Sequence, residues 1–403
     1  MRYALKSSMA GLAVACAFAA PLSRADVITD WNDKACAIVG KIGAGATGHR
    51  IMSIVQVSVY DAVTSIDGRN KPYLMRVAAP AGASVEAAVA AANRTVLNEL
   101  VPGEKAATEA AYQSALASIG EGPAKADGIA VGERAAIAVL ARAAADGSNV
   151  PETYQPRTTP GVYVPTMIPV FSTWTTRKPW IMASPDQFRP GPPPALSSDT
   201  WVRDYNEVKA LGGKNSTQRT AQQTEIARFW EETRPLIYHP VMRSVAMRPQ
   251  RTVAQNARLY AVGTVAMDDA MIAIFDAKYT YQFWRPITAI RNGGGNSATT
   301  QDLGWMPFIP TPMHPEYPCA HCTAAGAYGA VLLAEIGTGP APRLSSTSPT
   351  LPGATRSWTS VAEFVQEVSE ARIYDGVHYR NSTEVGSALG RKVGELAVAK
   401  LMN

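Results

Sequence analysis

Apolar residues recur at helical spacing through the first third of the chain. One stripe consists of Ile51, Ile54, Val55, Val59, Ala62 and Val63. Spacings of three and four residues are those of one face of an amphipathic helix. Further helices are predicted from about Ser84 to Val101, over 104–119 and over 123–145. We interpret these segments as core-building helices and assign them no chemistry.

The same periodicity returns in the second half of the chain. Predicted helices cover 198–211, 216–232, 252–281 (as two helices), the stretch from Pro318 to about Gly337, 361–374 and 382–402. Ser360 and Glu363 form a capping-box pattern before the helix over 361–374. Residues 292–301 and 339–357 are predicted loops. Because no strand-like run competes with these helices, the predicted class is all-α.

Between the two helical regions, residues 148–196 hold 11 of the chain's 29 prolines. Proline interrupts helices, so this stretch is predicted to be an extended connector. Its Trp, Tyr and Phe residues indicate that it packs on the body of the protein, and loops of this length often form a lid or a pocket wall. The predicted organisation is an N-terminal helical half over 26–197, connector included, and a C-terminal half over 198–403.

The first 25 residues have the pattern of a secretory leader. Arg2 and Lys6 precede an apolar run over 9–22, and Ser23-Arg24-Ala25 is a small-x-small cleavage signature. The run is too short to span a bilayer comfortably, and no later segment looks transmembrane. We therefore expect cleavage after Ala25 and export to the periplasm or the medium, which N-terminal sequencing of the mature protein would check.

The leader also accounts for most of the basic charge. The formal net charge is +5, and the loss of the three basic leader residues lowers it to +2 (5 − 3). Such a chain has no electrostatic footprint for nucleic acid, so the expected partners are small molecules. Cleavage removes Cys16 and leaves Cys36, Cys319 and Cys322. A local pair, a pair with Cys36 and three reduced thiols all stay open.

Candidate chemistry centres on residues 315–322, which read Pro-Glu-Tyr-Pro-Cys-Ala-His-Cys. Pro315 and Pro318 exclude a helix before the cysteines, and a run of small apolar residues follows them. His321 is therefore expected in the first turn of a buried helix. The start of a helix offers unpaired N–H groups and the positive end of the helix dipole, which together favour an anion.

Two basic clusters flank this stretch in the sequence. Lys278 and Arg285 lie upstream at a spacing of seven, which on a continuous helix would place them on one face. Arg372 and His378 lie downstream. Each residue alone is unremarkable, but buried cations need a partner and one oxoanion can satisfy several of them. The joint pattern predicts a pocket for a tetrahedral oxoanion.

This pattern also resembles a known family. The segments concerned are Lys278-x6-Arg285-Pro286, Pro318-Cys319-Ala320-His321 and Ala371-Arg372-x5-His378. They are similar to the motifs K-x6-R-P, P-S-G-H and S-R-x5-H-x3-D of the vanadium-dependent haloperoxidase and type 2 phosphatidic acid phosphatase superfamily. Similarity over 188–196, 219–224 and 229–230 points to the bacterial haloperoxidase branch. The resemblance implies a large helical domain of two packed helix bundles.

The resemblance further implies a role for each matched position. The implied oxoanion-binding residues are Lys278, Arg285, Cys319, Ala320 and Arg372, of which Ala320 would donate its backbone N–H. His378 would be the axial group, which ligates vanadium in a peroxidase or attacks phosphorus in a phosphatase. His321 would be the acid–base partner. His314 lies outside the motifs and is expected to be structural.

Three positions depart from the family pattern. Cys319 replaces the serine of the second motif, which exchanges a good hydroxyl donor for a weak thiol, and Ala320 replaces its glycine. Ser382 replaces the closing aspartate of the third motif. Its hydroxyl either orients His378, more weakly than a carboxylate would, or caps the last helix. If Ser382 orients the histidine, Ser382→Asp is expected to raise the activity.

These features leave three candidate functions. The first is halide oxidation by hydrogen peroxide with vanadate as cofactor, in a pocket whose wall would include Trp284, Trp305 and Phe308. The second is phosphoester hydrolysis through a phosphohistidine, without a cofactor, and the third is an oxoanion-binding relative without catalysis. Hypohalite would oxidise a Cys319 thiol, which favours the phosphatase. Similarity to the bacterial branch favours the haloperoxidase, which is our prediction; the oligomeric state stays open.

Overall fold

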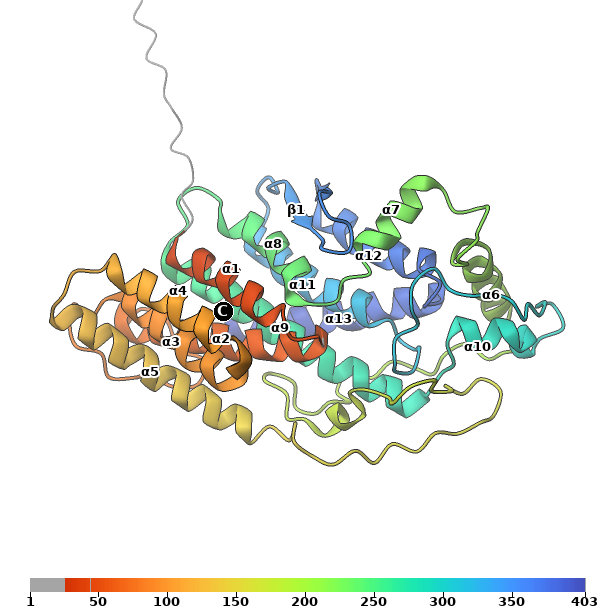
Figure 1. The fold of residues 1–403 in the computed structure, drawn as a ribbon, viewed down its shortest axis with the longest axis horizontal. Coiled ribbons are helices and arrows are strands. Elements are labelled where there is room, and N and C mark those ends of the chain that lie inside the picture. Colours follow the sequence, from red (N-terminus) through yellow and green to blue (C-terminus); the bar gives the residue numbers. More distant parts are fainter. Residues whose placement is uncertain (1–25, 44, 403) are drawn as a thin grey trace, which may run out of the picture.

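The computed structural model describes residues 26–43 and 45–402, so the predicted leader over 1–25, Cys16 included, and Asn403 lie outside it. Over these residues the chain is all-α apart from one small hairpin, as predicted (Figure 1). The helices before the connector are α1 (Val27–Val39), α2 (Gly45–Asp67), α3 (Val85–Leu100), α4 (Lys105–Ala117) and α5 (Pro123–Ala144). The helices after it are α6 (Asp199–Leu211), α7 (Ala221–Phe229), α8 (Pro235–Ala246), α9 (Val253–Tyr281), α10 (Pro286–Arg291), α11 (Ala320–Ile336), α12 (Val361–Tyr374) and α13 (Arg380–Leu401).

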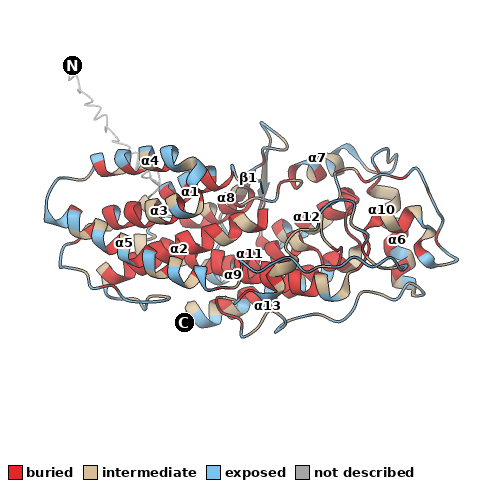
Figure 2. Cartoon of the chain, turned by 60° about the horizontal axis from the view of Figure 1, so that its bottom comes forward, coloured by how far each residue is buried: buried red, intermediate tan, exposed pale blue. Residues whose placement is uncertain are grey.

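The long helix α9 lies at the centre of the molecule. It packs against α2, α11 and α13, and buried residues run along all four helices (Figure 2). Every residue from Leu259 to Lys278 is buried. A helix that is buried on all sides belongs inside a large core, not at a surface. Helices from both ends of the sequence therefore share one core around α9.

Three local predictions differ from the structure. Residues 253–281 form one helix instead of two, because no turn or proline interrupts them. Helix α8 was not predicted, since Pro240 lies inside it and proline normally breaks a helix. The predicted loop over 339–357 contains an antiparallel hairpin of β1 (Leu344–Thr347) and β2 (Thr355–Trp358). Beyond these three differences, the helix predicted over 216–232 is shorter in the structure (α7, Ala221–Phe229), and α10 was not predicted. The remaining predicted helix bounds agree with the structure to within about two residues.

Small residues allow α11 and α13 to pack backbone against backbone. Gly386, Gly390 and Gly394 lie four residues apart on α13 and face α11. A Cβ atom at Gly390 would lie 1.9 Å from the carbonyl oxygen of Thr323, a distance that no packed structure tolerates. The close approach brings the start of α13 beside the start of α11, where the backbone N–H of Cys319 donates to the Ser382 carbonyl at 3.1 Å.

The proline-rich connector packs on the helices through buried ion pairs. Between α5 and α6, the described backbone contains one short 3-10 helix at Ser172–Thr176 and no α-helix. Arg177 lies between Asp146 and Asp268, at 3.0 and 2.9 Å, and all three side chains are buried. Asp269 accepts the backbone N–H groups of residues 180–182. Asp268 and Asp269 on α9, together with Asp146 just after α5, therefore hold the connector in place.

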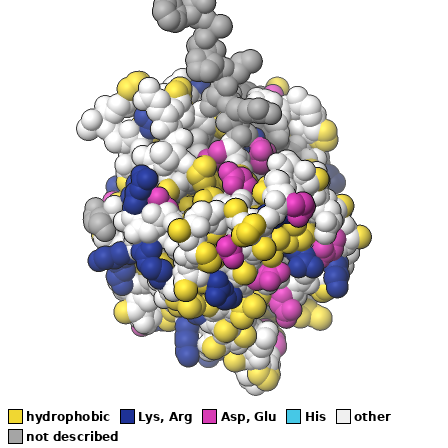
Figure 3. Space-filling view, turned by 90° about the vertical axis from the view of Figure 1, so that its left-hand side faces the viewer, with side chains coloured by type: hydrophobic (Ala, Val, Ile, Leu, Met, Phe, Trp, Pro, Cys, Tyr) yellow, Lys and Arg dark blue, Asp and Glu magenta, His cyan; other side chains and the backbone are white. Residues whose placement is uncertain are grey.

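The surface carries charges of both signs. At the end of the molecule formed by α3, α4 and α5, acidic and basic side chains are interspersed (Figure 3). Among the helices of the described residues, none combines the length and the apolar character that a bilayer crossing requires.

The interior contains a histidine, His239, that makes stability depend on pH. Its Nδ1 lies 2.8 Å from the side-chain amide of Asn32, and burial lowers its pKa from 6.5 to about 3. Between these pH values the unfolded chain binds one more proton than the folded one, so the free energy of unfolding rises with pH. We expect His239→Gln to reduce that slope by about 1.4 kcal/mol per pH unit between pH 4 and 6.

Urea unfolding of both proteins at several pH values measures this effect. Because the comparison is between wild type and variant, the contributions of all other titrating groups cancel. Parallel curves of unfolding free energy against pH would contradict the prediction.

Candidate functional site

A cavity of about 100 Å³ lies where α2, α9, α11 and the end of α12 meet. Four of the chain's five histidines line it: His49, His314, His321 and His378. Arg372 and Ala320 also border the cavity, and the connector contributes Phe171. The cavity therefore gathers residues of the second and third motifs, whereas Lys278 and Arg285 of the first motif are not part of its lining.

The first turn of α11 presents free backbone donors to this cavity. Cys319 is the N-cap residue, and its sulfur accepts a hydrogen bond from the N–H of Cys322 at 3.1 Å. The N–H groups of Ala320 and His321, which both line the cavity, have no acceptor among the described residues. Unpaired donors at the positive end of a helix are suited to an anion.

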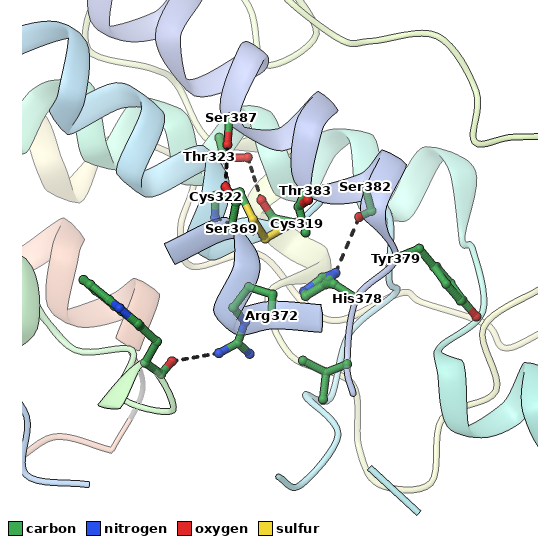
Figure 4. The surroundings of a disulfide bond; sticks show 12 residues. Cys319, Cys322, Thr323, Ser369, Arg372, His378, Tyr379, Ser382, Thr383 and Ser387 are labelled. Carbon is green, nitrogen blue, oxygen red and sulfur yellow. Dashed lines mark hydrogen bonds between the residues drawn. A yellow bond between two sulfur atoms is a disulfide. The ribbon is translucent and has the colours of Figure 1, made fainter. Parts of the chain in front are cut away.

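Arg372 enters the cavity from the last turn of α12 and is 1% exposed. Its Nη1 donates to the carbonyl oxygen of Trp230 at 2.7 Å (Figure 4). The same nitrogen forms an ion pair with Asp375 at 2.5 Å. Its Nε is buried and has no hydrogen-bond partner in the part of the chain that the structure describes. A buried donor without an acceptor costs free energy, which a ligand oxygen would recover.

Lys278 and Arg285 are both buried, but they do not lie on one helix as their spacing suggested. After the end of α9, Gln282 turns the backbone with a φ of 49°, and Arg285 then precedes α10. Lys278 Nζ donates to the carbonyl oxygens of Pro315 and Glu316 at 2.9 and 2.7 Å. The turn between two helices, not helical periodicity, brings both cations to the residues before α11.

Arg285 connects three segments of the site. Its Nε donates to the carbonyl oxygen of His314 at 3.0 Å and its Nη1 to that of Val377 at 2.8 Å. Nη1 also lies 3.3 Å from Nε2 of His378, and Nη2 lies 3.1 Å from Nδ1 of His314. His314 was expected to be only structural; it lines the cavity and contacts a cation of the site.

The site contains more positive than negative charge. The buried cations are Lys278, Arg285 and Arg372, and the buried carboxyl groups beside them are Glu316 and Asp375. Burial raises the pKa of both carboxyl groups to about 7, although the cations oppose the shift. Burial and the neighbouring Arg285 lower the pKa of Lys278 well below its ordinary value. A bound anion would compensate this buried positive charge.

Both motif histidines are neutral in this environment. Burial lowers the pKa of His321 and His378 well below 6.5, and the adjacent arginines lower it further. Nε2 of His321 lies 3.1 Å from the carbonyl oxygen of Glu232. Because a carbonyl only accepts, Nε2 carries the proton and Nδ1 of His321 is left with a lone pair.

Glu316 is the residue that sequence reasoning missed. Its Oε1 lies 2.7 Å from Nδ1 of His378. The Ser382 hydroxyl lies 3.5 Å from the same atom (Figure 4). Ser382 is also not the N-cap of α13, since Tyr379 holds that position. The available signal was a lone glutamate between two prolines, next to the histidine motif.

Cys319 and Cys322 form a disulfide across the first turn of α11 (Figure 4). Cys36 is a buried free thiol, so the pairing left open by the sequence is decided. A disulfide sulfur has no S–H, which corrects the expectation that the Cys319 thiol lies beside the oxoanion as a weak donor. The donors at this turn are the backbone N–H groups.

The aromatic residues at the cavity are not the predicted ones. Trp284 and Trp305 belong to a separate buried cluster with Trp201. Phe308 stacks beneath two arginine side chains. The aromatic residues that line the cavity are Phe171, Tyr238 and Phe275. Closeness in sequence to the motifs was misleading, because this lining comes from the connector, α8 and α9.

The donors present fit a tetrahedral oxoanion such as vanadate or phosphate. Arg372, with its unpartnered Nε, and the two unpaired N–H groups border the cavity and can take up negatively charged oxygens. Lys278 and Arg285 lie outside the lining, where they donate to carbonyl groups of neighbouring residues and add positive charge near the cavity. A neutral imidazole, that of His378, stands at the same cavity and can approach the central atom. The site therefore offers hydrogen-bond donors for the oxygens of an anion and one imidazole nitrogen for its central atom.

Sequence comparison matches parts of the chain to known proteins. Residues 258–403 match the family described as the VCPO second helical-bundle domain. Vanadium chloroperoxidase of Curvularia inaequalis is 28% identical over 178 residues, which cover 35% of this chain and 28% of the chloroperoxidase. The matched part therefore spans less than a third of that protein's length.

Two solved structures are similar along almost the whole chain. A bacterial vanadium-dependent iodoperoxidase has a TM-score of 0.80 at 24% identity, covering 93% of this chain and 96% of its own. An apo-type bacterial vanadium-dependent chloroperoxidase has a TM-score of 0.73 at 18% identity, covering 88% and 92%. At these identities the likeness concerns the fold. Residues 258–403 thus match the second helical-bundle domain of the vanadium chloroperoxidase family, and the fold of almost the whole chain is similar to that of the bacterial vanadium-dependent haloperoxidases.

Proposed function

We propose that the protein oxidises halide with hydrogen peroxide at a vanadate held in the cavity. The observation that carries this proposal is the excess of buried positive charge around one neutral imidazole, in a fold shared with bacterial vanadium-dependent haloperoxidases. Vanadate supplies a Lewis-acidic centre that activates peroxide for oxygen transfer to a halide. The residues of this chain would bind the vanadate and transfer protons to and from the reacting oxygens.

The binding roles follow from the contacts. Lys278, Arg285 and Arg372 would hold the oxygens of the oxoanion, together with the N–H groups of the first α11 turn. His378 would offer the lone pair of Nε2 to the vanadium. In the structure this atom faces a guanidinium nitrogen of Arg285 at 3.3 Å, so Arg285 and the histidine point to the same place.

His321 would handle protons during the reaction. Its Nε2 proton is held by the Glu232 carbonyl, which leaves Nδ1 as the acceptor. A neutral imidazole can take a proton from incoming peroxide and return it to a departing oxygen. The low pKa of His321 is due to burial and to Arg372, and a bound anion would oppose the effect of Arg372.

The disulfide weakens the objection that a free Cys319 thiol raised against oxidation chemistry. Hypohalite attacks thiolates first, and a free Cys319 beside the reaction would be consumed. Because Cys319 is bonded to Cys322, no thiol of the described residues lines the cavity. The disulfide also agrees with the proposed export to an oxidising compartment.

The test compares two reactions on one preparation. The mature protein is incubated with or without orthovanadate, and oxidation of chloride, bromide and iodide by peroxide is measured by halogenation of a dye. Hydrolysis of a phosphomonoester is measured in the same buffers. We expect halide oxidation that requires vanadate and that phosphate inhibits by competition. Hydrolysis without vanadate, in the absence of halide oxidation, would replace this proposal by the phosphatase.

A further inference from the structure

We infer that Glu316, from the loop before α11, is the positioning residue that sets the orientation and tautomer of His378. The inference deepens the proposed function, on which it rests for the role of His378 as a ligand. Glu316 Oε1 lies 2.7 Å from His378 Nδ1, and both side chains are almost completely buried. The family pattern has its carboxylate four residues after the histidine, where this chain has Ser382.

The two neighbours of the imidazole ring determine its tautomer. Nε2 of His378 lies 3.3 Å from Nη1 of Arg285. A guanidinium has donors and no acceptor, so Nε2 must be the acceptor and must lack a proton. The proton of the neutral ring is then on Nδ1, where it is donated to Glu316. Glu316 therefore stabilises the tautomer with a lone pair on Nε2, which faces Arg285 here and would bind a ligand once that contact is given up.

Glu316 is itself held rigidly from several sides. Its backbone carbonyl accepts from Lys278 Nζ at 2.7 Å, and its backbone N–H donates to the carbonyl of Phe283 at 2.9 Å. Its Oε1 also accepts the backbone N–H of Tyr379 at 3.2 Å. Lys278 thus contributes to the site in a second way, by fixing the loop that carries the carboxylate.

Ser382 cannot replace this interaction at the observed geometry. Its hydroxyl lies 3.5 Å from Nδ1 of His378, at the outer limit of a hydrogen bond. A carboxylate also makes the opposite ring nitrogen a better ligand than a hydroxyl does. The carboxylate that orients His378 therefore comes from the loop before α11. The family pattern has this carboxylate in the third motif instead.

The first measurement is oxoanion affinity, determined by calorimetry with vanadate and, separately, with phosphate. Glu316→Gln keeps the size of the side chain and removes its charge. We expect the affinity for vanadate to fall by about 10- to 100-fold, as is usual when the hydrogen-bond partner of a ligating histidine is changed. Ser382→Ala is the matched comparison: it removes the 3.5 Å contact with His378 and a hydrogen bond to the Glu316 carboxyl group, so we expect a smaller loss of affinity than in Glu316→Gln.

The second measurement returns the charge to the family position. The double variant Glu316→Gln/Ser382→Asp is expected to recover most of the lost affinity, because an aspartate four residues after His378 reaches the same ring nitrogen. Ser382→Asp alone would place two carboxylates beside one imidazole and is expected to lower the affinity or leave it unchanged. This outcome would revise the expectation, drawn from the sequence, that Ser382→Asp raises the activity.

The third measurement reads the tautomer directly. Long-range ¹H–¹⁵N spectra of the five histidines distinguish protonated from unprotonated ring nitrogens, and His378 is assigned by its loss in His378→Gln. We expect a protonated Nδ1 in wild type and in Glu316→Asp, which keeps the charge, and a mixture of tautomers in Glu316→Gln. If Glu316→Gln does not fold, Glu316→Asp and the double variant carry the test.

The outcomes separate this inference from the proposed function. Unchanged vanadate affinity and an unchanged His378 tautomer in Glu316→Gln would overturn the inference. The inference would also be overturned if adding Ser382→Asp to Glu316→Gln restored neither the vanadate affinity nor the Nδ1-protonated tautomer of His378. A protein that oxidises no halide but loses phosphate affinity and the Nδ1 proton in Glu316→Gln would support the inference while the proposed function fails.

Discussion

Replacing His378 by alanine is expected to lower vanadate affinity by more than about 100-fold and to abolish halide oxidation. Changing a hydrogen-bond partner of a ligating histidine usually costs about 10- to 100-fold, so the loss of the ligand itself should exceed that range. The three cations and the α11 turn remain in this variant. Weak oxoanion binding without turnover is therefore the expected result, measured by calorimetry and by the halogenation assay.

A second buried histidine provides the control. His239 lies outside the cavity, and His239→Gln is expected to bind vanadate like wild type at neutral pH, where this side chain is uncharged in the folded protein. Added imidazole is expected to restore part of the vanadate affinity of His378→Ala by entering the space left by the ring. Wild-type vanadate affinity in His378→Ala would show that the ligand is another residue.

The largest effect on stability is expected from Arg177→Met. This guanidinium lies between Asp146 and Asp268, and all three groups are buried. Although burial opposes it, Arg177 and Arg50 lower the pKa of Asp146 to about 2. Removing one partner of a buried ion pair leaves charges unpaired and typically costs about 3–5 kcal/mol. We expect a loss of unfolding free energy of that order, measured by urea unfolding at pH 7.

An exposed ion pair gives the matched control for this variant. Lys41 pairs with Glu104 at 2.6 Å, but its side chain is 59% exposed. Exposed pairs contribute at most about 1 kcal/mol, so Lys41→Ala should be nearly neutral. Equal losses in the two variants would contradict the argument from burial. Arg177→Met is also expected to weaken halide oxidation, because the connector that it anchors brings Phe171 to the cavity.

Much of the fold follows from local sequence patterns. The stripe from Ile51 to Val63 and the capping residue Ser84 predict α2 and α3 because helical periodicity and caps are local properties. Pro318 determines that α11 starts after it, since proline cannot continue a helix on its N-terminal side. The exception is α8, where Pro240 is tolerated because the surrounding side chains are buried. In α8 the packing of buried side chains outweighs the helix-breaking effect of proline.

The motifs predicted which residues to examine at the site, but not how they meet. Lys278 and Arg285 are separated by the turn at Gln282, and the sequence spacing alone suggested a shared helix face. The structure places both at the loop before α11, and it adds His314 to the cavity. Spacing reports neighbours along one element, whereas this site is built from several.

The sequence by itself determined the all-α class, the starts of most helices and the order of the three motifs, because these depend on residues close together in the chain. Only the tertiary structure decided that Glu316 faces His378, that Cys319 pairs with Cys322, and that Phe171 replaces the predicted tryptophans at the cavity. The partners of a buried polar or aromatic group are set by close packing between distant segments, which no local pattern encodes.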